Sequence, residues 1–127
     1  MTYQEILARV DHTLLAQTAT WEEIRRLCDD AVFYHTASEC IPPCFVKKAR
    51  DYLGNQLNVC TVIGFPNGNH TTRAKVFEAE DALNNGADEL DMVINIGALK
   101  EKKYDYVERE IRAIKETAES HVLKVII

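Results

Sequence analysis

Five short runs rich in β-branched residues alternate along this sequence with longer segments that have the apolar period of a helix. These runs, which predict strands, are residues 10–14, 37–41, 59–63, 90–94 and 122–127. Strands joined through single helices run parallel, because a crossover helix returns the chain to the same end of the sheet. The runs lack polar alternation, so both faces of the sheet are expected to be covered. The pattern predicts an α/β fold, either an open doubly wound sheet or part of a barrel.

Four amphipathic helices are expected between the strands. The first begins after Thr20, which forms a capping-box pattern with Glu23 and precedes an inward face that includes Cys28. The second lies between Pro42-Pro43 and Gly54, where a missing N–H and a left-handed cap are both tolerated. These signals predict the start of the first helix and both ends of the second.

The last two expected helices are defined by their apolar spacing. The third begins at Thr71 or Thr72 and ends at Gly86, and its inward side chains are those of Val76, Ala79 and Leu83. The inward residues of the fourth are Val107, Ile111, Ile114 and Ala118. The residues expected to face water in the fourth are Glu108, Glu110, Arg112 and Lys115.

Length and charge restrict the function. A chain of 127 residues is one domain, but a closed barrel of alternating strands and helices needs about 250 residues. The net charge of −5 disfavours nucleic-acid and anionic-membrane partners. The chain has no apolar stretch near the roughly 20 residues of a membrane span and no signal-peptide pattern, which predicts a cytoplasmic location. Its four cysteines are expected to be buried, reduced thiols.

Two charged residues lie inside predicted strands. Lys124 is either a pocket ammonium paired with Asp91 on the neighbouring strand or an outward lysine whose stem packs on apolar surface. Asp91 needs a partner or a pocket, because an unpaired carboxylate is costly to bury. Asp88 and Glu89, just before it, are interpreted as an acidic surface turn.

Two other features have a functional and a structural interpretation. His12 could titrate near neutral pH as a catalytic group, or it could be hydrogen-bonded scaffolding near a strand end. Residues 64–69 follow a strand and precede a helix, where backbone amides can cradle an anion. Because they match no nucleotide-binding fingerprint, a tight loop is the preferred interpretation.

Several longer motifs resemble those of the deoxyribose-phosphate aldolase family of class I aldolases. They are residues 10–15, 60–66, 85–95 and 123–127, and they occur in the family's order over essentially the whole chain. The resemblance implies a (β/α)8 barrel that reversibly cleaves 2-deoxyribose 5-phosphate to glyceraldehyde 3-phosphate and acetaldehyde, without a metal or organic cofactor. It places the Schiff-base lysine on the sixth strand, a second lysine on the seventh and the phosphate in the last two βα loops.

The resemblance also assigns roles within this sequence. Asp91 matches the family aspartate that takes part in proton transfer, and Lys124 matches a fifth-strand lysine that lines the pocket. Asp11, Thr13 and Cys40 match positions at or near the substrate cavity. The chain is therefore expected to be the N-terminal half of an aldolase TIM barrel, residues 1–127, and to be inactive alone because it lacks the Schiff-base lysine.

Glu39 departs from the family pattern, which usually has an apolar residue between this serine and cysteine. If Cys40 points into the barrel, strand alternation points Glu39 outward beneath the helices. Burying that charge would cost several kcal/mol unless it were paired or hydrated.

Two alternatives remain open. A five-stranded parallel sheet leaves two bare edges and an apolar inner face, which predicts self-association as a homodimer or a higher oligomer. Five parallel strands also suit a small flavodoxin-like binding module. Strand order separates the fold classes, because sequential neighbours indicate a barrel piece and a reversal at the first strand indicates an open sheet.

Overall fold

The computed structural model describes residues 1–127 and contains five strands, each at a position predicted from the sequence. The strands are β1 (Asp11–Thr13), β2 (Ser38–Ile41), β3 (Asn58–Ile63), β4 (Glu89–Val93) and β5 (Val122–Ile126). The helices are α1 (Tyr3–Leu7), α2 (Trp21–Tyr34), α3 (Val46–Leu53), α4 (Thr72–Asn84), α5 (Ile96–Lys100) and α6 (Tyr104–Ala118), with a 3-10 helix η1 (Pro43–Phe45) before α3. The short helices α1 and α5 were not predicted. No helix has the length and apolar content needed to cross a bilayer.

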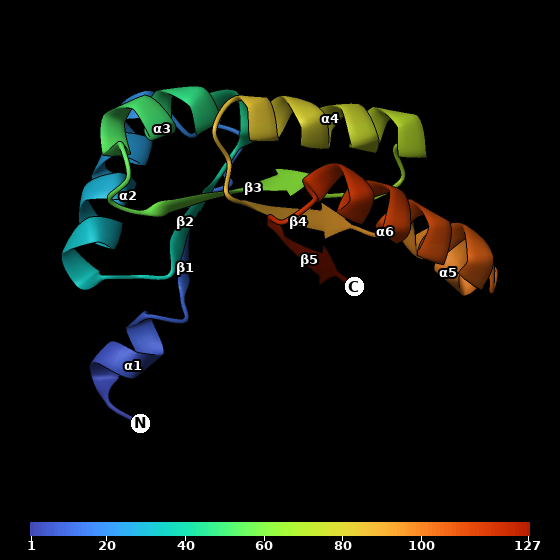
Figure 1. Ribbon diagram of the computed structural model, residues 1–127, viewed down its shortest axis with the longest axis horizontal. Coiled ribbons are helices and arrows are strands. Elements are labelled where there is room, and N and C mark those ends of the chain that lie inside the picture. Colours follow the sequence, from blue (N-terminus) through green and yellow to red (C-terminus); the bar gives the residue numbers. More distant parts are fainter.

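The five strands form one parallel sheet in the order β1-β2-β3-β4-β5. Sequential order without a reversal is that of a barrel segment, so the flavodoxin-like alternative is wrong. Helices α2, α3, α4 and α6 follow one another around the outer side of the curved sheet (Figure 1). The fold is therefore a partial (β/α)8 barrel. The helices cover the outer face, and Cys40, Cys60 and Val62 on the inner face are buried as well, so both faces of β2 and β3 are covered as expected.

The helix ends follow local chemistry. Thr20 caps α2 by accepting a hydrogen bond from the Glu23 N–H, and the Glu23 carboxylate accepts one from the Thr20 N–H, as the capping box predicts. Gly54 ends α3 at φ +57°, a backbone conformation that L side chains rarely adopt. Thr71 caps α4 through the Ala74 N–H.

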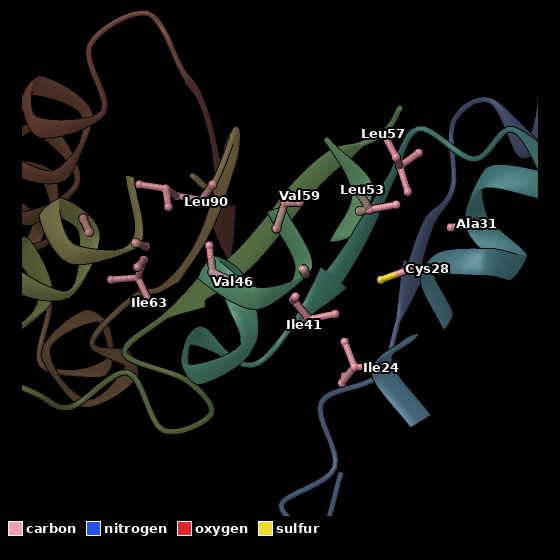
Figure 2. Packing of buried hydrophobic residues seen from close by; sticks show 14 of the residues in the cluster. Ile24, Cys28, Ala31, Ile41, Val46, Leu53, Leu57, Val59, Ile63 and Leu90 are labelled. Atoms are coloured by element: carbon pink, nitrogen blue, oxygen red, sulfur yellow. The ribbon is translucent and has the colours of Figure 1, made fainter. Parts of the chain in front are cut away.

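The main core lies between the outer face of the sheet and the helices. Figure 2 shows Ile24 and Cys28 of α2 packed toward Ile41 of β2, and Val46 of α3 beside Val59 of β3. Along each strand the next residue points to the opposite face. A second, smaller cluster of Cys40, Cys60 and Val62 therefore lies on the inner face.

Glu110 is not exposed, which corrects one prediction for the fourth helix. Its side chain is 1% exposed and lies 2.5 Å from the ammonium of Lys75, which is fully buried in α4. Lys75 also donates to the backbone oxygen of Val93 in β4, at 2.9 Å. The ion pair joins α4, α6 and β4 behind the sheet, and it explains how two charged residues occupy inward helix positions.

Glu39 points outward beneath the helices, as strand alternation predicts, and is fully buried. One carboxylate oxygen accepts a hydrogen bond from the Cys28 thiol at 2.7 Å, while the other has no hydrogen-bond partner. Burial raises the pKa of Glu39, and the Cys28 hydrogen bond and the charge of Arg50 offset this only in part. Glu39 is accommodated as a buried carboxyl that resists ionisation, not as half of an ion pair.

Candidate functional site

Lys124 is the centre of a charged cluster on the inner face of the sheet. Its ammonium pairs with Asp11 of β1 and lies 3.2 Å from Glu89 and 3.2 Å from Asp91, both on β4. Asp11 and Lys124 belong to the two edge strands, so their contact spans the inside of the curved sheet. The curvature of the barrel segment, rather than strand adjacency alone, assembles this cluster.

The cluster keeps Lys124 charged. Burial by itself lowers the pKa of Lys124, but the hydrogen bond with Asp11 and the charge of Asp91 outweigh it, and the net shift is upward. Burial likewise acts to raise the pKa of Asp11, yet hydrogen bonds from Lys124 and Ser38 give a net downward shift. Three carboxyl groups, those of Asp11, Glu89 and Asp91, therefore surround one ammonium group.

The two key carboxylates are held differently. Asp11 accepts a hydrogen bond from the Ser38 hydroxyl at 2.6 Å, and the Thr13 hydroxyl donates to the Asp11 backbone oxygen at 2.8 Å. Asp91 Oδ1 is buried and has no hydrogen bond of good geometry, although it lies 3.2 Å from the Lys124 ammonium. Asp11 is fixed by hydrogen bonds from its neighbours, whereas Asp91 Oδ1 is held by its ion pair with Lys124.

Two cysteines adjoin this cluster. Cys40 of β2 and Cys60 of β3 are register partners on the inner face and are 3% and 0% exposed. Their sulfur atoms and a carboxylate oxygen of Asp91 all lie within 4.8 Å of one another. Cys28 is also buried, but Cys44 is exposed, which corrects the expectation that all four thiols are buried.

Two other sequence features take no part in the cluster. His12 points to the helix side of β1, where its Nε2 lies 3.9 Å from Asp30. The loop after β3 is closed on itself, because Gly68 N–H donates to Gly64 O at 2.7 Å and Gly64 N–H donates to the Glu78 carboxylate at 3.0 Å. The Gly64 and Gly68 amides are thus engaged within the protein, which fits the tight-loop interpretation.

An open cleft of about 400 Å³ lies at the carboxyl ends of β1, β2 and β3. It is lined mainly by apolar side chains, among them those of Leu15, Pro42, Val62 and Phe65. The carboxyl ends of the strands are the face on which barrel enzymes bind their substrates. Lys124 and Asp91 do not line this cleft, so the charged cluster is set on the inner face beside it.

Sequence reasoning missed two members of the cluster, Glu89 and Ser38. Glu89, interpreted as part of a surface turn, lies in β4 with its side chain 14% exposed and pairs with Lys124. The signal was present, since residues two apart on a strand share a face and Glu89 precedes Asp91 by two. Asp88, by contrast, points to the helix side and forms an ion pair with Arg50.

Comparison with known proteins gives a consistent result. Residues 6–127 match the family described as DeoC/LacD family aldolase. The chain is 59% identical over 127 residues to a deoxyribose-phosphate aldolase of Streptococcus pyogenes serotype M4, covering 100% of this chain and 57% of that protein. It is 58% identical to one of Streptococcus agalactiae serotype Ia, with the same coverage. The chain thus spans little more than half the length of these curated relatives.

Solved structures agree with the sequence relatives. A structure from Coccidioides immitis superposes with a TM-score of 0.94 at 43% identity, covering 98% of this chain and 50% of that one. The tetrameric deoxyribose phosphate aldolase of Aeropyrum pernix superposes with a TM-score of 0.84 at 30% identity, covering 96% of this chain and 52% of that one.

Proposed function

This chain belongs to the DeoC/LacD family of aldolases, and we propose that it supplies the proton-transfer half of a deoxyribose-phosphate aldolase active site. The observation that carries the proposal is the cluster of Lys124 with Asp11, Glu89 and Asp91 on the inner face of the barrel segment. Asp91 and Lys124 occupy the positions that the family resemblance assigns to proton transfer and to the pocket wall.

Lys124 acts as a fixed cation in this proposal and not as the nucleophile. An amine attacks a carbonyl only when it is neutral, and a Schiff-base lysine therefore needs a lowered pKa. The pKa of Lys124 is raised instead, because Asp11 and Asp91 stabilise its charged form despite burial. The imine must form on another lysine, which the family resemblance places on the sixth strand, a strand that this chain does not contain.

Asp91 is the proton acceptor in the proposal. In a retro-aldol cleavage the hydroxyl next to the breaking carbon–carbon bond loses its proton, and the resulting enamine later gains one. A carboxylate with a free oxygen can carry out both transfers, directly or through a water. Asp91 Oδ1 has no hydrogen-bond donor of good geometry and lies 3.2 Å from the Lys124 ammonium.

The charge of the cluster also indicates where the substrate phosphate binds. Three carboxylates and one ammonium repel a phosphate but favour further cations. This agrees with a phosphate site in the last βα loops and with additional active-site ammonium groups on the strands that complete the barrel. The proposed substrate is accordingly a phosphorylated 2-deoxy sugar whose phosphate lies away from Lys124.

A chimera tests the proposal. The 127 residues replace the matching part of the Streptococcus pyogenes relative, and cleavage of 2-deoxyribose 5-phosphate is followed by reduction of the triose phosphate product. We expect turnover by the chimera and none by the 127-residue chain alone. Asp91→Asn should lower kcat by at least about 100-fold.

The control substitution is Lys47→Met, which removes a cation from an exposed pair with Asp51. It should leave kcat unchanged, whereas Lys124→Met should lower it. Turnover by the chain alone, or Asp91→Asn and Lys47→Met chimeras of equal activity, would contradict the proposal.

We also propose that the 127-residue chain self-associates through β5. This edge strand exposes Val122, Val125 and Ile126 at 48%, 37% and 36%. An unpaired apolar edge favours pairing with the same edge of a second copy, which a two-fold axis permits. Sedimentation at rising concentration should show a dimer or a higher oligomer, and a folded monomer throughout would refute this.

A further inference from the structure

The inner face carries the one group of three potential metal-ligating side chains in the chain, and it is formed by Cys40, Cys60 and Asp91. We propose that these residues form a binding site for Zn²⁺. Occupancy of this site would take Asp91 away from Lys124 and so inhibit the aldolase site. The inhibitory consequence rests on the function proposed above, but the binding itself does not.

The donor set is suited to zinc. Two cysteine sulfurs and one carboxylate oxygen leave a fourth, open position of a tetrahedral ion, as in sites with three protein ligands. Thiolates select Zn²⁺ over hard cations such as Mg²⁺ or Ca²⁺, which prefer all-oxygen ligands.

The geometry needs little rearrangement. With zinc–sulfur bonds of about 2.3 Å, the two sulfurs of a tetrahedral site lie about 3.8 Å apart. The three donor atoms already lie within 4.8 Å of one another, on side chains that share the inner face of adjacent strands. Because the three side chains share this face, rotation about their side-chain bonds can bring the donors together around one ion.

A separate observation points to the same place. Asp91 Oδ1 is buried and accepts no hydrogen bond of good geometry, and its ion-pair partner is the Lys124 ammonium at 3.2 Å, so a metal ion would compete with Lys124 for this oxygen. The surrounding charge is also favourable, since Asp11, Glu89 and Asp91 outnumber Lys124. A divalent cation would therefore enter a region that already lacks positive charge.

Zinc binding releases two protons. Cys40 and Cys60 each lose a thiol proton to solvent as one Zn²⁺ forms bonds to both sulfurs and to the Asp91 carboxylate, so the net charge of the site does not change. Zinc binds the thiolate form of cysteine, so the metal must displace the thiol protons of Cys40 and Cys60. Binding should consequently strengthen as the pH rises.

The test is a zinc titration of the 127-residue chain under reducing conditions, in competition with a chromophoric chelator. We expect one Zn²⁺ per chain, with affinity reduced at least about 100-fold by Cys60→Ser or Asp91→Asn. The matched control is Cys44→Ser, because Cys44 is exposed and outside the site, and it should bind as the parent does. Absence of binding, binding unaffected by Cys60→Ser, or binding lost in Cys44→Ser would overturn the proposal.

Two measurements on the unaltered sequence keep the test valid if a variant fails to fold. Co²⁺ in place of Zn²⁺ should give sulfur-to-cobalt charge-transfer absorption, and titration in buffers of different ionisation enthalpy should detect release of both thiol protons. A cobalt spectrum without sulfur bands would overturn the proposal.

The effect of zinc on aldolase activity is measured with the chimera. Zn²⁺ should inhibit the parent chimera, and a Cys60→Ser chimera should keep its own zinc-free rate when zinc is added. An active chimera whose 127-residue parent binds no zinc would refute the metal site alone. Zinc binding by the chain together with an inactive chimera would refute the proposed aldolase function alone.

Discussion

The buried ion pair between Lys75 and Glu110 gives the sharpest prediction about stability. The two side chains are 0% and 1% exposed, and their charged atoms lie 2.5 Å apart. Lys75 also donates to Val93 O, and Glu110 accepts from the Thr72 hydroxyl at 2.7 Å. Lys75→Met keeps most of the side-chain stem but leaves the Glu110 carboxylate buried without its cation. Removing one partner of such a pair costs about 3–5 kcal/mol.

The double variant Lys75→Met with Glu110→Leu should lose less than either single variant. Replacing both charges by apolar groups of similar volume removes the desolvation penalty along with the attraction, and the net cost is often near zero. The expected coupling free energy between the two sites is therefore about 3 kcal/mol or more. The Lys75 side chain packs closely against Gly64, where an added Cβ would lie 2.7 Å from Lys75 Cε.

Urea unfolding followed by circular dichroism measures these differences, and a variant without a folded baseline counts as a large loss. The control is the exposed pair of Lys47 and Asp51, where Lys47→Met should change the free energy of unfolding by less than about 1 kcal/mol. A loss below about 1 kcal/mol for Lys75→Met, or a double variant that loses the sum of the two single losses, would refute the reasoning.

Three further predictions concern single side chains. Glu39 has a folded-state pKa above its ordinary value of 4.5, so its contribution to stability is complete below pH 4.5 and is lost as the pH rises through the raised value. Midpoints of urea unfolding measured across pH should show this decline, and Glu39→Gln should flatten it. Thr20→Ala removes the capping box of α2 and should cost about 1 kcal/mol in urea unfolding, with no change if the cap is unimportant. Arg50→Met removes donors to Gly54 O at 2.6 Å and Gly86 O at 3.0 Å and the ion pair with Asp88. It should lower the free energy of unfolding by at least about 2 kcal/mol in the same assay. A loss under about 0.5 kcal/mol would contradict this.

Hydrophobic period and caps were sufficient to predict the main elements. The bounds of all five strands are predicted to within one residue, because β-branched runs bounded by Gly, Pro and Asn define strands well. Thr20, Gly54 and Thr71 mark helix ends through hydrogen bonds local in sequence. The short helices α1 and α5 were missed because five residues are too few to show a period.

The burial of charged side chains was the feature that the sequence predicted least well. The charge of Glu110 predicts exposure to solvent, but its position predicts burial, since it lies three residues after Val107 and four before Ile114 on the inward face. Its partner Lys75 lies 35 residues earlier, and a pairing at that distance leaves no local pattern. A charged residue at an inward helical position is therefore a reason to search for its partner on a neighbouring helix.

The candidate site was predictable in part. Asp91 and Lys124 stand out as charged residues inside strands, and parallel order makes them neighbours. The contact between Asp11 and Lys124 depends on sheet curvature, which strand adjacency does not contain.

The most direct test of the account is to locate the imine. The chimera is incubated with 2-deoxyribose 5-phosphate and borohydride, and the reduced adduct is mapped by mass spectrometry of its peptides. Because the carboxylates around Lys124 hold it in the charged form, we expect the adduct on a lysine of the grafted Streptococcus pyogenes segment and none on Lys124. A reduced adduct on Lys124 would show that this amine is nucleophilic and would contradict the account.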